Sequence, residues 1–233
     1  MLKKTYIIFG NKTKNVSLNI QIKNNPIQKQ NETKFLGVVL SSNLKWTLHI
    51  KVVIGKISKS VGIIAKVRHL IPQSLTRMLY LTLVEPYLNY CNIIWASSKE
   101  TTELLKILRI QKKYCRLITF SCYQAHTEEL FKNLQFLNIF KIYKLQLACH
   151  MFKIRNNLTS DIYNFSVNED FHTYQTRHKD DIHKDFCRTK CRQDTVRFQG
   201  PKLWNSLPTE IKDVSSLNLF KKKIKQYLLQ DSK

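Results

Sequence analysis

The sequence predicts a mainly α-helical protein with a small β-rich segment at its N-terminus, an α+β chain. Two patterns carry this prediction. Apolar and polar residues alternate between Val16 and Ile22, which is typical of a half-buried strand. From Thr47 onward apolar residues recur at spacings of three and four, which is typical of amphipathic helices. A hydrophobic content of 43% is ordinary for a globular protein, so the chain can bury a core.

Residues 1–46 form the predicted β-rich segment. Residues 5–9 favour a strand, residues 16–22 form the alternating strand, and Pro26 follows a break. A third strand is predicted from Thr33 to Leu40, where Gly37 indicates a bulge or a close backbone approach. Because three strands bury little by themselves, we expect them to complete a sheet or to pack on the helices that follow.

Residues 47–158 form a predicted helical domain. Its first helix runs from Thr47 to about Ile71, before Pro72. Ser74 is predicted to cap a second helix, which is kinked or broken at Pro86. The apolar and aromatic residues 87–95 are predicted to be core. Two more helices are predicted over residues 100–119, with an acidic start and a basic end that suit the helix dipole, and over residues 138–157.

The last part of the chain divides into two predicted segments. Residues 159–199 are polar, lack periodicity and form a connector that is a candidate for disorder until it meets a partner. Residues 200–233 begin with a compact apolar knob around Trp204 and end in a helix capped by Ser216. The residues of this last helix predicted to face inward are Leu219, Phe220, Ile224, Tyr227 and Leu228.

The net charge of the chain limits the classes of partner that it can bind. Lysine and arginine number 39 against 16 aspartates and glutamates, a formal net charge of +23. Residues 1–160 contain no aspartate, and residues 33–84 contain no acidic residue. So much charge of one sign opposes compaction, which indicates a polyanionic partner: RNA or DNA first, an anionic membrane surface second. The predicted phosphate-binding residues on helices are Lys51, Lys59, Lys66, Lys106, Arg109, Lys113 and Arg116, and Arg68, His69 and Arg77 are candidates to join them.

The cysteines indicate an intracellular setting. Six of them are scattered, and four lie in apolar, helix-like segments, where cysteine behaves as a small hydrophobe. The N-terminus shows no secretory signal, and no segment approaches the ~18 uninterrupted apolar residues that a membrane span needs. We expect a protein of the nucleus or cytoplasm that does not cross a bilayer.

Sites with other chemistry are poorly supported. His183, Cys187 and Cys191 could place three zinc ligands on one helical face, with His172 or His178 as a fourth, but a matched second Cys pair is absent. The His126–Glu129 segment reads better as an exposed turn than as an acid–base site. The tryptophans and tyrosines in apolar blocks could stack on bases, but core packing explains them better. We expect no catalytic residue, metal or cofactor.

Several sequence blocks resemble, in order, the region after the catalytic palm of non-LTR retrotransposon reverse transcriptases of the LINE and jockey type. The blocks are Lys34-Phe35-Leu36-Gly37-Val38 with Trp46, His49-Ile50 and Lys56-Ile57-Ser58-Lys59; Tyr87-Leu88-Asn89-Tyr90-Cys91 with Trp95; Ile110-Gln111-Lys112-Lys113 with Arg116-Leu117-Ile118; His172-x-Tyr174-x-Thr176-Arg177; and Gly200-Pro201-x-Leu203-Trp204-Asn205-x-Leu207-Pro208. Each block is weak alone, and their order over nearly the whole chain makes the resemblance specific.

The resemblance implies the last palm strands, a primer-grip segment and a helical, thumb-like bundle with a C-terminal extension. It adds Lys34, Phe35, Leu36 and Gly37 as candidates to position a primer end, against the alternative of a buried strand with a glycine kink. The family's Tyr-x-Asp-Asp turn is absent, and the single Asp-Asp pair, Asp180-Asp181, lies in the connector. Magnesium is therefore expected only in an intact parent polymerase.

The resulting expectation is a C-terminal fragment of an RNA-directed DNA polymerase that binds template–primer RNA and DNA without sequence preference and does not polymerise alone. Two alternatives stay open. One is a non-catalytic structural or protein-interaction remnant of a transposable element, and the other is an unrelated membrane-surface protein.

Overall fold

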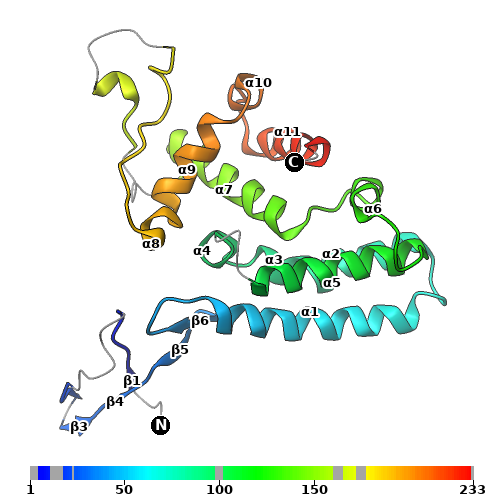
Figure 1. The fold of residues 1–233 in the computed structure, drawn as a ribbon, viewed down its shortest axis with the longest axis horizontal. Coiled ribbons are helices and arrows are strands. Elements are labelled where there is room, and N and C mark those ends of the chain that lie inside the picture. The colour runs from blue at the N-terminus through cyan, green and yellow to red at the C-terminus, as the bar shows by residue number, and fades with distance from the viewer. Residues whose placement is uncertain are drawn as a thin grey trace. The chain divides into compact units, whose positions relative to one another are not determined.

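The computed structural model describes residues 5–10, 18–22, 24–97, 102–159, 165–171 and 177–231. Helices hold about 58% of the chain and strands 9%, which confirms the mainly α-helical class with a small N-terminal β segment. Two compact units, Met1–Lys56 and Ile57–Lys233, divide the chain, and helix α1 (Thr47–Val67) crosses the boundary between them (Figure 1). The predicted boundary at residue 46 therefore falls ten residues too early, at the start of α1.

The first unit contains short strand pairs. β1 (Thr5–Tyr6) pairs in parallel with β4 (Gln28–Lys29), and β2 (Gln21–Ile22) pairs antiparallel with β3 (Asn25–Pro26). The third pair is the antiparallel hairpin of β5 (Glu32–Phe35) and β6 (Val38–Ser41). The described strands form two-stranded sheets only. Residues 16 and 17 of the predicted strand at residues 16–22 lie outside the described residues. Within residues 18–22 only Gln21–Ile22 forms a strand, so the prediction of one half-buried strand over this segment is wrong.

The prediction of one strand from Thr33 to Leu40 is wrong, because the chain reverses in its middle. Phe35 pairs with Val38, so Leu36 and Gly37 form a two-residue turn. Their φ angles are 45° and 82°, and positive φ at both central residues is the signature of a type I′ hairpin turn. Glycine accepts this backbone without a steric cost. Gly37 is thus a turn residue and not a bulge.

The second unit is helical and is organised around helix α7, which packs against α3, α4, α5, α9 and α11. The bounds of its helices after α1 are α2 Gln73–Leu83, α3 Glu85–Asn89, α4 Asn92–Trp95, α5 Thr102–Thr119, α6 Thr127–Asn133, α7 Ile139–Arg155, the 3₁₀ helix η2 Asn168–Asp170, α8 Lys190–Gln193, α9 Val196–Asn205, α10 Thr209–Lys212 and α11 Leu217–Gln230.

A buried glutamine joins three of these helices. The Gln111 amide donates to the Tyr80 hydroxyl at 2.9 Å and to the Leu137 carbonyl at 3.2 Å, and its oxygen accepts from the Ile139 N–H at 2.8 Å. Next to it, the Tyr114 hydroxyl donates to the Thr76 carbonyl at 2.7 Å. These bonds fix α5 against α2 and against the start of α7, and every polar atom of the buried amide is used.

The predicted cap at Ser216 is confirmed, but two other predicted helix ends are wrong: α1 ends at Val67, before the predicted Ile71, and Ser74 does not cap α2. Asn138 caps α7, and Ser216 caps α11 by accepting the Leu219 N–H. Ser74, in contrast, lies inside α2, which begins at Gln73 after Pro72. The residues that the sequence predicts to be core but that the structure leaves exposed are Tyr87, Tyr90, Ile94 and Leu219. Tyr87 lies in α3, Tyr90 follows α3, and Ile94 lies in α4. The chain turns between these two short helices at Cys91, whose φ is positive, so the three side chains do not share one helix face.

The predicted boundary at residue 199 is also wrong, because helix α9 runs through it. Gly200 and Pro201 lie inside that helix and are buried. A Cβ atom on Gly200 would come within 2.4 Å of the Met151 sulfur, so the missing side chain lets α9 approach α7 closely. Trp204 is buried and stacks with Phe220 of α11, at a ring-centroid distance of 5.9 Å.

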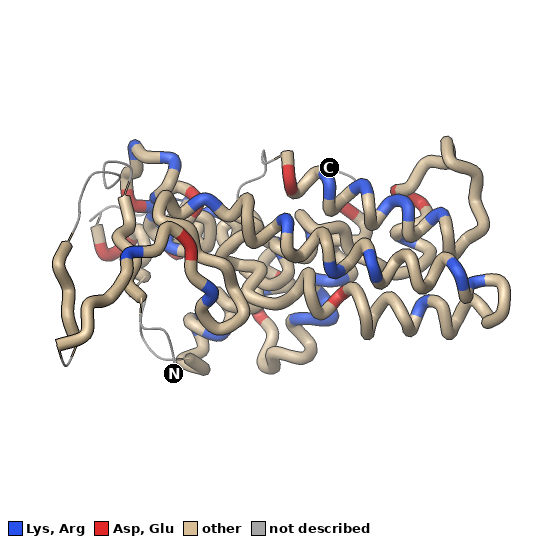
Figure 2. Tube along the Cα trace, turned by 90° about the horizontal axis from the view of Figure 1, so that it is seen from below, with Lys and Arg blue, Asp and Glu red and all other residues tan. Residues whose placement is uncertain are grey.

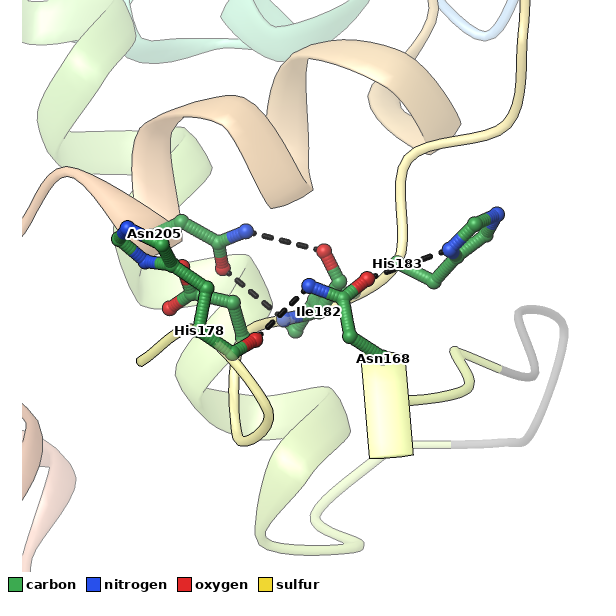
Figure 3. A network of polar contacts seen from close by, with 6 residues as sticks. Asn168, His178, Ile182, His183 and Asn205 are labelled. Atoms are coloured by element: carbon green, nitrogen blue, oxygen red, sulfur yellow. Dashed lines mark hydrogen bonds and ion pairs between the residues drawn. The ribbon is translucent and has the colours of Figure 1, made fainter. Parts of the chain in front are cut away.

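Part of the predicted connector is held in place by a polar network (Figure 3). The Asn205 amide accepts from the Ile182 N–H at 3.1 Å and donates to the Ile182 carbonyl at 2.9 Å. It thus satisfies both backbone groups of Ile182, as a neighbouring strand would. Ile182 is buried and forms a bridge with Val167. Asn168 contacts the His178 carbonyl and the His183 ring. Residues 160–164 and 172–176 of the connector, including His172, lie outside the described residues.

We predict that Asn205→Ala releases this segment while the helices stay folded. The change removes both partners of the buried Ile182 backbone, which costs about 1–3 kcal/mol. Hydrogen exchange should show faster exchange at Ile182 and His183, with slow exchange retained in α7. Asn218→Ala, at an exposed position of α11, is the matched control. Unchanged protection at Ile182 in Asn205→Ala would contradict this assignment.

Candidate nucleic-acid interface

Helix α5 carries four of the predicted phosphate-binding residues, which are Lys106, Arg109, Lys113 and Arg116. Its buried residues, which are Glu103, Leu104, Ile107, Gln111, Tyr114, Cys115 and Ile118, occupy the opposite side of the helix. Arg109 and Lys113 are exposed, and neither makes a hydrogen bond or ion pair with the described residues. Lys106 is exposed but pairs with Glu103 at 2.9 Å. Residues 104–127 contain no acidic side chain, so the field at the outer face of α5 is positive along its length.

Helix α1 carries the other predicted lysines. Lys59 and Lys66 are exposed and lie seven positions apart, which places them on one side of the helix. That side is opposite the buried residues Ile57, Val61 and Ile64. Lys51 is also exposed, but it belongs to the first unit. Figure 2 shows lysine and arginine along the helices and far fewer acidic positions.

The guanidinium groups of three arginines donate hydrogen bonds to backbone carbonyls. Arg68 donates to the Leu117 carbonyl at 3.0 Å, and Arg77 donates to the Leu134 carbonyl at 3.0 Å. Arg116 donates twice to the Ala125 carbonyl, at 3.2 and 3.0 Å. Leu117 and Leu134 lie at the C-terminal ends of α5 and α6, where carbonyls lack helical partners. Each of these arginines therefore stabilises a helix end or a loop, and phosphate contact by Arg116, with Arg68 and Arg77 as candidates to join it, stays a prediction.

The β5–β6 hairpin presents the other predicted site. Phe35 is 62% exposed and Leu36 is 74% exposed, and Lys34 and Gly37 are also exposed. The alternative in which Phe35 and Leu36 are buried in a strand is wrong. Exposing the large apolar side chains of Phe35 and Leu36 to water is unfavourable. Exposed apolar surface at neighbouring positions indicates a contact site. The hairpin belongs to the first unit and α5 to the second.

A histidine ties this hairpin to the start of α1. The Val39 N–H donates to His49 Nδ1 at 3.3 Å, and His49 is buried. Burial, followed by the charge of Lys56, lowers the pKa of His49 below its usual value of 6.5. The neutral ring is the form that can accept this hydrogen bond.

The described residues offer no assembled metal site. No group of three or more His, Cys, Asp or Glu side chains within them could hold an ion. The His183 ring instead contacts Asn168 and stacks on Phe171, and Cys187 donates to the Thr189 carbonyl. Burial raises the pKa of Cys115 to about 12, so its thiol is protonated at neutral pH and is a poor nucleophile.

Other sequence candidates are now placed. His126 is exposed before α6, whose first turn contains Glu128 and Glu129, a favourable arrangement for the helix dipole. Trp95 and Trp204 are buried, as core packing predicts. The sequence did not predict that Phe120 and Tyr123, which follow α5, are exposed, or that the arginines donate to backbone carbonyls. Phe120 has a positive φ, and this signal is visible only in the backbone geometry.

Comparison of the chain with protein-family models, with curated proteins and with solved structures found no match in any of the three. In the part of the chain that the structure describes, no helix has the length and apolar character to span a bilayer.

We predict that acidification loosens the β5–β6 hairpin. The unfolded state binds a proton near pH 6.5, above the lowered pKa of folded His49, so stability is complete above about pH 6.5 and falls as the pH decreases through the folded pKa. Amide exchange at Val39, corrected for its intrinsic pH dependence, should accelerate between about pH 7 and 5. His126→Gln, a change at an exposed histidine, should leave this response intact. Constant protection at Val39 over that range would refute the role of His49.

Proposed function

We propose that this chain binds RNA and DNA mainly through their phosphates, as the non-catalytic C-terminal part of an RNA-directed DNA polymerase of the non-LTR retrotransposon type. The observation that carries the proposal is the outer face of α5. Arg109 and Lys113 are exposed there, in a segment without acidic residues. The ordered blocks that resemble the reverse transcriptases supply the identity of the parent enzyme.

The physics of this face favours contact without sequence preference. Lysine and arginine on a helix surface neutralise phosphates and release condensed counterions, which gives affinity that falls steeply with salt. Such contacts position the nucleic acid but do not read its bases. Holding a template–primer of any sequence requires this kind of contact, so the chemistry of α5 suits a polymerase grip.

In the same proposal the β5–β6 hairpin contacts the primer end. Its tip combines the charge of Lys34 with the exposed side chains of Phe35 and Leu36. Gly37 has no side chain, so a sugar–phosphate can approach the turn closely. The exposed tip supports this reading because a contact residue has to reach its ligand.

The chain is proposed not to polymerise alone. Two-metal phosphoryl transfer needs carboxylates that hold both ions. The one Asp-Asp pair follows Lys179, and the Asp181 carboxylate lies 2.9 Å from the His178 ring. Asp181 thus takes part in the connector network, where its backbone carbonyl also accepts from the Asn168 N–H.

Exposed apolar residues favour a second candidate function. Leu75 and Met78 of α2, Tyr87 of α3 and Tyr90 just after α3 are all exposed. A protein-interaction module could use such residues, and it would keep its partner after the α5 charges are removed.

We predict that Arg109→Gln with Lys113→Gln weakens binding of both single strands and duplexes. Removing two phosphate contacts should reduce the slope of log Kobs against log salt by about 2. Fluorescence anisotropy with labelled oligonucleotides at several salt concentrations measures this slope. Arg116 is left unchanged because it holds Ala125.

The matched control is Lys221→Gln with Lys222→Gln, which removes equal charge from exposed positions of α11. It should change the slope less than the α5 pair does. Equal effects of the two variants would show that net charge, and not the α5 face, drives binding. Affinity that is independent of salt in the unaltered chain would refute the proposal.

We also predict that the purified chain with Mg²⁺, nucleotides and a primed RNA template extends no primer. The reason is that no group of His, Cys, Asp or Glu side chains within the described residues could hold the metal ions. Denaturing gels with a commercial reverse transcriptase as positive control give the measurement. Primer extension that stays with the chain through repeated purification, at constant specific activity, would overturn this part of the proposal.

A further inference from the structure

Two exposed aromatic rings follow helix α5, and each has an arginine on one face. Phe120 is 57% exposed, and the Arg68 guanidinium lies 4.9 Å from its ring centroid. Tyr123 is 88% exposed, and the Arg116 guanidinium lies 5.6 Å from its ring centroid. The His69 ring also contacts Phe120, at a centroid distance of 5.3 Å. The α1–α2 turn therefore lies beside the loop after α5, at the right of Figure 1.

The backbone holds Phe120 outward at an energetic cost. Its φ is 52°, and the Ser121 N–H donates to the Arg116 carbonyl at 3.1 Å, which is the Schellman pattern at a helix end. The left-handed position of this motif usually holds glycine, and a bulky side chain there is an outlier. Strained residues of this kind concentrate at binding sites.

The loop that carries Tyr123 is also fixed in advance. Arg116 donates twice to the Ala125 carbonyl, and the Thr119 and Ser121 hydroxyls share a hydrogen bond of 2.7 Å. Because the arginines are already positioned by carbonyls, their planar groups stay at the rings without further ordering. Each ring therefore has a fixed positive charge over one of its faces.

We propose that Phe120 and Tyr123, with Arg68 and Arg116, form a stacking platform for the unpaired bases of single-stranded RNA or DNA. This inference rests on the proposed function and names its substrate class. Aromatic rings beside positive charge bind single strands because every unpaired base offers a π face, whereas duplex bases are already stacked. Lys113 lies one turn before Arg116 and supplies a phosphate contact next to the platform. No acidic residue occurs in residues 57–84 or 104–127, which contain the platform.

The test compares single-strand and duplex binding after the rings are removed. Phe120→Gly suits the left-handed backbone better than phenylalanine does, so it removes the ring without endangering the fold. Tyr123→Ala alters a side chain that is almost fully exposed. The double variant should bind a single strand of about 12 nucleotides at least ~5-fold more weakly and should bind a duplex of equal length within about twofold of the unaltered chain.

Two further measurements make the result specific. Phe186→Ala is the matched control, because Phe186 is 90% exposed, Lys184 and Arg188 lie two positions from it, and the described residues place no arginine on its ring. It should leave single-strand affinity unchanged. Photo-crosslinking to an oligonucleotide that contains 4-thiouridine should attach to the peptide around Tyr123.

The outcomes separate this inference from the proposed function. If the unaltered chain binds neither single strands nor duplexes at low salt, the proposed function fails. If it binds both and the double variant binds single strands as tightly as the unaltered chain, the platform alone is refuted. Crosslinks confined to other peptides would also refute the platform.

Discussion

A scarcity of carboxylates is the constraint on which the rest of this molecule depends. With 39 basic and 16 acidic residues, cations cannot be balanced by ion pairs alone. The fold uses backbone carbonyls at loops and helix ends as substitutes: Arg68, Arg77 and Arg116 each donate to one. A guanidinium suits this role because its donors are fixed in a plane. Two lysines do the same, because Lys141 and Lys223 donate to the carbonyls of Asp231 and Glu210. Lys59 and Lys66 of α1 and Lys113 of α5 remain exposed.

Neutral side-chain amides position the helices and one backbone segment here, a role that ion pairs have in other proteins. Gln111 unites α2, α5 and α7, and Asn205 fixes the backbone of Ile182 to α9. A buried amide that is fully bonded costs less to desolvate than a charge, so it positions helices without adding to the charge problem. The side-chain contacts of both amides lie within the chain.

The sequence predicted the helices well because burial repeats along them. Ile57, Val61 and Ile64 are buried at their helical spacing, and the caps at Asn138 and Ser216 follow from side-chain chemistry. What it missed was long-range or backbone-dependent. A two-residue turn at Gly37 and a bulge there give nearly the same apolar pattern. The carbonyl partners of the arginines lie up to 57 positions away, and no periodicity records them. The exposure of Phe120 and Tyr123 was missed for the same reason.

The central claim is that cations without an internal partner form the surface that meets nucleic acid. Lysine acetylation footprinting tests it most directly, because the reagent reports the accessibility of every lysine in one experiment. With a single-stranded oligonucleotide present, Lys66 and Lys113 should be protected, and Lys221 and Lys222 should react as they do in the free chain. Uniform protection of all lysines, or protection on α11 with none on α5, would contradict the account.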